Sequence, residues 1–238
     1  MRIKKYAAQA MIYLTVVSFF LAATWWGSRA VTVISQEIPV EREYTIVIDA
    51  GHGGEDGGAV SCTGVKESAI NLEIALRLND LLHLLGCRTR MIRTTDISVY
   101  TDGNSLSQKK VSDLKQRVRI ISETENPVLV SIHQNTFSDP RYSGGQIFYN
   151  GERESKVLAD ALQAGFSEVL NPGSKRQAKS ADGIYLMETV RCTAVLAECG
   201  FLSNPREEAL LRIPAYQQKI SCVLASTLCN HLDRQTND

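Results

Sequence analysis

The sequence has no excess charge of either sign, because 26 lysines and arginines balance 26 aspartates and glutamates. A protein that binds nucleic acid usually presents a basic patch to the phosphates, so the composition gives no electrostatic support for such a partner. Internal repeats and low-complexity segments are also lacking, which argues against a solenoid. At 238 residues, the chain is long enough for one well-buried globular domain.

CxxC pairs are absent as well, although the chain has six cysteines: Cys62, Cys87, Cys192, Cys199, Cys222 and Cys229. Cysteines in an exported protein often form disulfides. Most of these residues instead lie in apolar runs, where a cysteine behaves as a small hydrophobic side chain. The pattern therefore does not favour a disulfide framework. We expect Cys222 and Cys229, seven residues apart on a predicted helix, to share a face and pack.

The N-terminal segment differs in character from the rest. Three basic residues precede residues 7–26, which contain no charge. A run of about 20 apolar residues can cross a bilayer, and the positive-inside rule would keep the basic residues in the cytoplasm. Trp25 and Trp26 favour a retained anchor, whereas the small residues within 28–30 would suit a signal peptidase. We expect residues 1–30 to be a membrane anchor or a signal peptide, and the rest of the chain to be extracytoplasmic.

The hydrophobic pattern predicts one α/β domain. Residues 31–43 lack periodicity and contain Pro39, so we expect a linker there and a domain over 44–238. Short β-branched runs alternate with amphipathic stretches, as in a sheet covered by helices on both faces. Several strands lack polar alternation and should be buried on both faces. The predicted strands are 45–48, 88–92, 128–132, 146–149, 184–187 and 194–197; the predicted helices are 67–85, 107–123, 152–170 and 215–232; a polar loop over 94–105 could border a substrate groove.

Three of these strands end at a side chain that can bind metal or carry a proton. His52 follows the first strand, His133 the third and Glu198 the last. The carboxyl ends of strands in α/β sheets form the crevice where ligands bind, so we expect these residues to converge. A single histidine at a strand end is more often structural. Two of the four histidines, together with an acid, favour a functional site.

Two histidines and a carboxylate form a common ligand set for catalytic zinc, which can polarise a carbonyl and activate water. Glu67 is a candidate third ligand, because it opens a predicted helix 15 residues after His52, across a glycine-rich turn. Spacing alone suits equally well an acid that stabilises a helix N-terminus. The glycine-rich segment 51–58 does not predict a nucleotide site, because it lacks the P-loop ending and the dinucleotide fingerprint.

Glu198 lies at the end of an apolar strand, where an unpaired carboxylate is costly unless a metal or water is near. It could take a proton from the attacking water and pass it to the leaving amine. The alternative is Cys199 as a nucleophile with His133 as its base. Adjacent strand residues point to opposite faces, so Glu198 and Cys199 should not share the crevice. We expect Arg117 to be a buried ion-pair partner, and Asn135 either to contact substrate or to brace a loop.

Four motifs in this order carry a resemblance to a known family. They are the run V-I-D-A-G-H-G-G-E-D-G-G-A at 47–59, Glu67 with Asn71-Leu72, the run S-I-H-Q-N at 131–135, and the run E-C-G-F-L-S-N at 198–204. Together they resemble the N-acetylmuramoyl-L-alanine amidases of the Amidase_3 type, over about residues 44–232. The resemblance implies zinc binding by His52, Glu67 and His133, and catalysis by Glu198.

The resemblance also implies a fold and an activity. The fold would be a single domain with a mixed, mostly buried sheet of about six strands flanked by helices, the zinc amidase (phosphorylase/hydrolase-like) fold. The activity would be zinc-dependent hydrolysis of the amide between N-acetylmuramic acid and L-alanine in peptidoglycan. The short chain without a wall-binding domain looks most like the sporulation and germination subgroup, which strips stem peptides from spore cortex so that a muramic acid deacetylase can complete the muramic lactam.

Two other readings stay open. A zinc peptidase that cuts within the stem peptide would use the same metal chemistry, and a non-catalytic wall-binding protein could keep the fold without turnover. An exposed metal site on a shallow groove would load weakly, which suggests a protein activator as a further partner.

Overall fold

The structure is a computed structural model that describes residues 11, 14–19, 22 and 43–235. It forms two compact units, Met1–Glu41 and Arg42–Asp238. The described residues of the first unit are helical. Within the described part of the chain, no helix is both long and apolar enough to cross a membrane. The predicted anchor or signal peptide and the linker lie largely outside the described residues and stay predictions.

The second unit is built on a six-stranded mixed sheet with strand order β2-β1-β3-β6-β4-β5. The strands β2, β1, β3 and β6 are parallel, β4 runs antiparallel to β6, and β5 is parallel to β4. Their bounds are β1 Thr45–Ala50, β2 Arg88–Met91, β3 Pro127–Asn135, β4 Gln146–Tyr149, β5 Lys179–Ser180 and β6 Thr193–Phe201. The predicted mixed sheet of about six strands is confirmed, and β1, β3 and β6 lie side by side in it.

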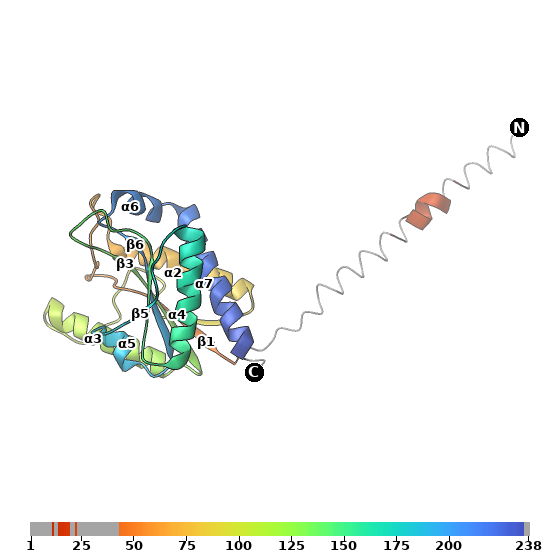
Figure 1. Cartoon of the computed structure of the whole chain (residues 1–238). Coiled ribbons are helices and arrows are strands. Elements are labelled where there is room, and N and C mark those ends of the chain that lie inside the picture. Colours follow the sequence, from red (N-terminus) through yellow and green to blue (C-terminus); the bar gives the residue numbers. More distant parts are fainter. Residues whose placement is uncertain (1–10, 12–13, 20–21, 23–42, 236–238) are drawn as a thin grey trace, which may run out of the picture. The chain divides into compact units, whose positions relative to one another are not determined.

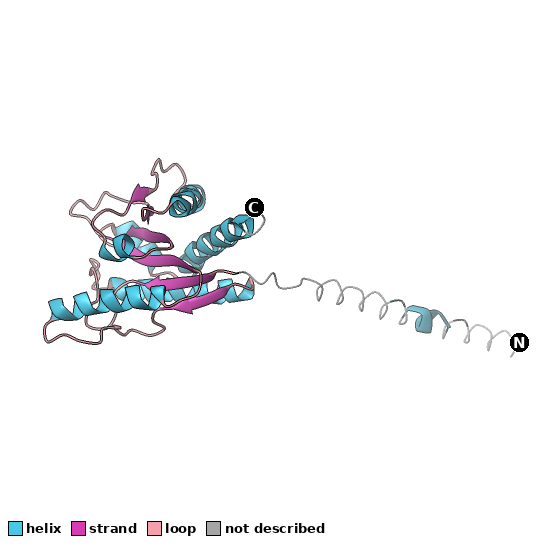
Figure 2. Ribbon diagram, turned by 90° about the horizontal axis from the view of Figure 1, so that it is seen from below, coloured by secondary structure: helices cyan, strands magenta, loops and turns pink. Residues whose placement is uncertain are grey.

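Helices cover the sheet on both faces (Figures 1 and 2). They are α2 Glu67–Leu84, α3 Leu106–Ser122, α4 Arg153–Gly165 with a π-helical turn η1 Phe166–Leu170, α5 Tyr185–Thr189, α6 Pro205–Leu211 and α7 Pro214–Gln235. The four long predicted helices correspond to α2, α3, α4 with η1, and α7. The three-layer arrangement follows from strands that are apolar on both sides.

The two faces of the sheet carry separate cores because successive strand residues point to opposite sides. Ile46 and Ile48 of β1 belong to the larger core, which α2, α4 and α7 cover. Val47 of β1 and Leu129 of β3 belong to the smaller core, which α3 and α5 cover. The central strands are therefore buried from both sides along most of their length.

One predicted strand is wrong. The segment 184–187 is not in the sheet; it leads into α5, and the sixth strand is the two-residue β5 at Lys179–Ser180. A four-residue apolar run fits a strand and a short helix equally well. Here Leu186 and Met187 are buried on one side of a single helical turn, against the smaller core.

The cysteines behave mainly as core residues. Cys87 and Cys229 are buried in the larger core, with their sulfur atoms 3.3 Å apart. Cys222 is exposed, whereas Cys229 is buried. The prediction that Cys222 packs with Cys229 is wrong: the two lie on nearly the same side of α7, seven residues apart, but only Cys229 is covered by the core and Cys222 is exposed.

Candidate metal and catalytic site

Two histidines and one glutamate meet at the carboxyl ends of β1 and β3. Oε2 of Glu67 lies 3.3 Å from Nε2 of His52, and its Oε1 lies 3.0 Å from Nδ1 of His133. Their ligand atoms all lie within 4.8 Å of one another. The two imidazole rings meet edge to face, with centroids 5.0 Å apart. The structure thus brings together the three side chains that the sequence singled out as metal ligands.

His52 follows β1 in a left-handed backbone conformation, with φ 61°. Such a conformation is uncommon for a residue with a side chain, so surrounding contacts must hold it. Arg117 donates to the carbonyl of His52 at 2.8 Å. Arg93 donates to the carbonyls of Ala50 and Gly51 at 2.8 and 3.1 Å. The two arginines therefore fix the backbone that presents His52.

Arg117 is itself held by carboxylates. Only 2% of its surface is exposed, and its guanidinium pairs with Asp49 and with Asp113. Burial alone would raise the pKa of Asp49, but Arg117, His133 and Ser131 together hold it below its usual range. The predicted buried ion-pair role of Arg117 is confirmed, and its donation to the His52 carbonyl connects that pair to the site.

Glu67 is the first residue of α2 and is 4% exposed. Besides the two histidines, it accepts from the backbone nitrogen of Ala59 at 2.9 Å and of Gln134 at 3.1 Å, and from Nδ2 of Asn71 at 3.2 Å. Burial alone would raise its pKa, but the hydrogen bonds and charges of His133 and His52 hold the pKa well below the usual range. Glu67 is therefore a fixed, ionised carboxylate.

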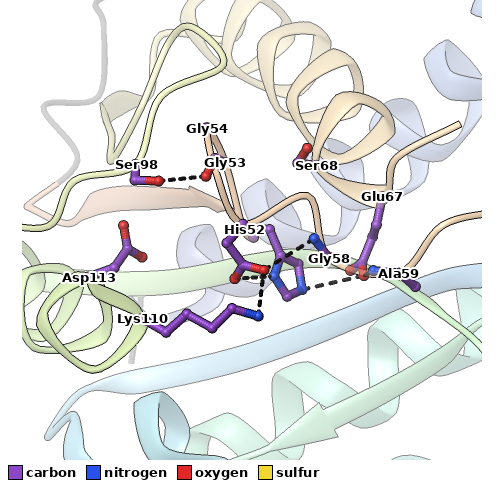
Figure 3. A network of polar contacts seen from close by, with 12 residues as sticks. His52, Gly53, Gly54, Gly58, Ala59, Glu67, Ser68, Ser98, Lys110 and Asp113 are labelled. Carbon is purple, nitrogen blue, oxygen red and sulfur yellow. Dashed lines mark hydrogen bonds and ion pairs between the residues drawn. The ribbon is translucent and has the colours of Figure 1, made fainter. Parts of the chain in front are cut away.

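The far side of the His52 ring is held by Asp56. Nδ1 of His52 donates to Oδ2 of Asp56 at 2.8 Å, which directs Nε2 toward Glu67. Oδ1 of Asp56 pairs with the amine of Lys110 at 2.8 Å, and Figure 3 shows Lys110 reaching from α3 toward His52. Burial lowers the pKa of His52, but Glu67 and Asp56 outweigh it and raise the pKa to about 9. A carboxylate behind a histidine is the usual support for a metal-binding imidazole.

Glu198 lies on β6 directly beside His133, its register partner on β3. Its Oε2 atom is buried and has no hydrogen-bond partner within the described residues. Burial and the charge of Glu67 raise the pKa of Glu198 to about 7, although the two histidines act in the opposite direction. A carboxyl group with a pKa near neutrality is suited to accepting and returning a proton.

Cys199 does not share this crevice. It is 1% exposed in the larger core, and burial raises the pKa of its thiol. A thiolate nucleophile at this position is therefore disfavoured. Asn135 ends β3, where its carbonyl accepts from the backbone nitrogen of Leu202 at 2.8 Å, which braces the turn after β6.

Two glycines allow the ligands to approach the backbone closely. A Cβ atom at Gly51 would lie 2.2 Å from Nε2 of His133. A Cβ atom at Gly58 would lie 2.6 Å from Oε2 of Glu67 and 2.7 Å from the His52 ring, and Gly58 also has a positive φ of 68°. Any side chain at either position would occupy the space that the candidate ligands fill.

A cavity of about 360 Å³ opens beside the cluster. It borders both histidines and Glu198, and its remaining lining comes mostly from α3, α5 and β6: Asp49, Gly51, Asp56, Lys110, Asp113, Leu114, Arg117, Ile184, Leu186 and Leu196. The polar loop over 94–105 reaches the His52 turn instead, where Ser98 Oγ donates to the carbonyl of Gly53 at 2.6 Å (Figure 3). None of residues 94–105 lines this cavity, so the prediction that the loop borders a substrate groove is not confirmed; the loop supports the ligand turn instead.

The donor set fits zinc. Two imidazole nitrogens and a carboxylate are the ligand types of catalytic zinc sites, which keep a further position open. The cavity borders both imidazoles, and the unpartnered buried oxygen of Glu198 lies beside them, where a cation or a water would satisfy it.

Several supporting residues were not found from the sequence: Asp56, Lys110, Asn71 as a Glu67 partner, Gln134 and Arg93. Arg93 gave a usable signal, because it directly follows the predicted strand 88–92, as His133 directly follows the predicted strand 128–132. The contact between Lys110 and Asp56 joins residues 54 positions apart and has no sequence signal.

Fold and site together define a class of protein: a single-domain α/β enzyme whose polar side chains meet at the carboxyl ends of adjacent central strands. Residues 46–230 match the family described as N-acetylmuramoyl-L-alanine amidase, Amidase_3. The germination-specific N-acetylmuramoyl-L-alanine amidase of Bacillus subtilis (strain 168) is 38% identical over 182 residues, which are 74% of this chain and 74% of that protein.

Solved structures agree. The CwlD amidase from Clostridioides difficile, in complex with the GerS lipoprotein, has a TM-score of 0.77 and 37% identity, covering 79% of this chain and 98% of that chain. An N-acetylmuramoyl-L-alanine amidase from Clostridium difficile 630 has a TM-score of 0.70 and 27% identity, covering 81% and 98%. The chain belongs to the N-acetylmuramoyl-L-alanine amidase family, Amidase_3, and is thus a hydrolase of an amide bond in peptidoglycan.

Proposed function

We propose that this amidase cleaves the bond between N-acetylmuramic acid and L-alanine with zinc held by His52, Glu67 and His133, and with Glu198 moving the proton. The observation that carries this proposal is the convergence of the three ligand atoms within 4.8 Å beside a buried, unpartnered carboxylate oxygen. A zinc ion there supplies Lewis acidity, which activates water and polarises the scissile carbonyl.

The chain's own residues perform the remaining steps. Glu198, whose pKa of about 7 leaves a large fraction ionised at neutral pH, accepts the proton of the attacking water. It then returns that proton to the departing amine nitrogen of L-alanine, so that the amine leaves in neutral form. Asp56 keeps His52 oriented, while Arg93 and Arg117 hold the backbone on which His52 lies.

Cell-wall amidase relatives support action outside the cytoplasmic membrane. Residues 1–30 would anchor the domain at the membrane or direct its export, and residues 31–43 would link this segment to the catalytic domain 44–238. Similarity to the germination-specific enzyme supports spore cortex as the site of action, where removal of stem peptides would precede a muramic acid deacetylase on the way to muramic lactam.

A protein activator is the second proposed partner. The CwlD structure contains a lipoprotein bound to the amidase. In this chain the candidate ligands are the buried carboxylate of Glu67 and two part-exposed histidines that border the cavity. A bound protein that restricts access to this cavity would retain the metal more firmly.

Two other activities use the same geometry and are distinguished by their products. A zinc peptidase would cut within the stem peptide, and a wall-binding protein would leave peptidoglycan intact. The test is mass spectrometry of peptidoglycan digests made with the full-length chain, with zinc and with a chelator. We expect zinc-dependent release of intact stem peptides that begin with a free L-alanine amine. Fragments cut inside the peptide, or intact peptidoglycan after incubation with zinc-loaded protein, would contradict the proposal.

A further inference from the structure

The cavity beside the metal ligands has two chemically different walls. One wall is apolar and consists of Leu114 from α3, Ile184 and Leu186 from the α5 segment, and Leu196 from β6. The remaining lining residues are mostly polar and include those of the ligand turn and the charged groups of α3. A substrate segment that fits this cavity should therefore combine a small apolar group with a polar or charged one.

Lys110 is the cation at the rim of this cavity. Its side chain is 48% exposed, and its amine lies 2.8 Å from Oδ1 of Asp56. An ammonium has three N–H donors, and this ion pair uses one of them. Arg117 also borders the cavity, but it is 2% exposed and donates to Asp49, Asp113 and two backbone carbonyls. Among the cations that line the cavity, Lys110 is thus the one with an accessible head group.

The chemistry of the substrate determines which side of the scissile bond such a cation can recognise. The lactyl carboxyl of muramic acid is consumed in the amide, so the glycan side carries no carboxylate near the bond. The peptide side continues from L-alanine, with its methyl group, to an acidic second residue. Lys110 lines the same cavity as His133 and Glu198, and Asp56 contacts both Lys110 and His52. A carboxylate on the peptide side of the scissile bond is therefore the substrate group that this cation can recognise.

We propose that this cavity is the peptide subsite, in which the apolar wall packs against the alanyl methyl and Lys110 binds the α-carboxylate of the second stem residue. The inference rests on the proposed amidase function and names the substrate groups that the enzyme recognises. Lys110 is a specificity residue: its amine gains a substrate carboxylate while it remains near Asp56. A charge-assisted hydrogen bond of this kind discriminates strongly against a neutral carboxamide of the same shape.

The test uses two muramoyl peptides that differ only in the second residue, glutamate with a free α-carboxylate or isoglutamine with a carboxamide. The full-length, zinc-loaded chain should cleave the free acid with a kcat/KM roughly 10-fold higher, mainly through KM. Lys110→Met should bring the ratio of the two kcat/KM values close to one, and Lys110→Arg should restore part of the preference. Because each ratio is measured on one enzyme, an altered zinc content cancels.

Lys109→Met is the matched control, since Lys109 pairs with exposed Glu55 and does not line the cavity; this variant should keep the wild-type ratio. Inhibition of peptidoglycan digestion by the two free dipeptides gives a second measure of the same selectivity. Cleavage of both substrates at equal rates by the wild type, or a preference that survives Lys110→Met, would overturn the subsite and leave the amidase function intact. Release of peptides cut elsewhere would instead count against the amidase function itself.

Discussion

His133 and Glu198 are register partners on adjacent parallel strands, β3 and β6. Both side chains therefore emerge on the cavity side at the same height of the sheet, one as a candidate ligand and the other as the candidate proton carrier. The backbone ladder sets this spacing, so neither side chain depends on a loop for its position. This rigidity makes the role of Glu198 testable by an isosteric substitution.

Glu198→Gln should reduce amide cleavage by at least about 100-fold, because an amide cannot accept and return the proton. Zinc content should remain that of the wild type, since Glu198 is not among the three clustered ligands. Amidase assays and metal analysis on the same preparations check both expectations. Wild-type turnover in this variant would remove Glu198 from the mechanism.

The same substitution should stabilise the metal-free protein at pH 8. The pKa of Glu198 is raised from 4.5 to about 7 in the folded state, so ionising it in the fold costs free energy above pH 7, whereas below pH 4.5 both states are neutral and the cost disappears. We expect a gain on the order of 1–3 kcal/mol at pH 8 that vanishes toward pH 4.5. Denaturant unfolding at the two pH values measures it; an equal gain at both would contradict the assigned pKa.

The pH dependence of activity follows from the same group. Glu198 must be ionised to accept a proton, so kcat/KM should rise with pH and level off once Glu198 is ionised. Its pKa of about 7 sets the upper bound for the midpoint, because a bound cation nearby lowers it. Zinc content measured at each pH separates this titration from metal loss. A rate that falls as pH rises from 5 to 7 would show that the protonated acid is the active form.

Gly51→Ala should displace His133, because the new Cβ would lie 2.2 Å from Nε2 of that ring. Since the backbone on both sides is clamped, the imidazole must move, and we expect zinc affinity to fall roughly 10–100-fold, as for other disturbed ligand shells. Gly151→Ala is the control, since nothing lies within 4 Å of a Cβ there. Competition with a chromophoric chelator measures both; unchanged affinity in Gly51→Ala would exclude His133 as a ligand.

Asp56→Asn keeps the size of the side chain but removes the charge that orients His52. We expect roughly 10–100-fold weaker zinc binding, because a carboxylate behind a ligating histidine raises its basicity and fixes its ring. Glu55→Gln is the adjacent control, since Glu55 is exposed and pairs with Lys109. If both variants bound zinc equally well, Asp56 would have no part in supporting the ligand.

Patterns within one segment predicted most of the fold and three candidate site residues, His52, His133 and Glu198, whereas the family resemblance was needed to single out Glu67. The strands before His52, His133 and Glu198 are β-branched and apolar, and parallel pairing then brings their carboxyl ends together. Glu67 was ambiguous because an acid also suits the first turn of a helix. Glu67 is the first residue of α2 and also contacts both histidines. It therefore fits both interpretations, an acid at a helix N-terminus and a candidate third ligand.

The failures were segments whose position depends on distant contacts. The two polar residues of β5 carry no hydrophobic signal, and only pairing with β4 makes them a strand. The helix α6 did carry a local signal, since Asn204 caps it and Pro205 opens it, but it is seven residues long and lacks apolar periodicity.

Arg93 and Arg117 hold the turn after β1 through carbonyl oxygens, and carbonyls are the same whatever the side chain. These hydrogen bonds thus constrain the backbone path of residues 50–52 without constraining the identity of every residue in the motif. Gly51 and Gly58 are fixed by the ligands that they touch, but other residues of the glycine-rich run can change while the path persists. The presence of both arginines should therefore indicate a turn that positions the metal ligand more reliably than the amino-acid sequence of the loop does.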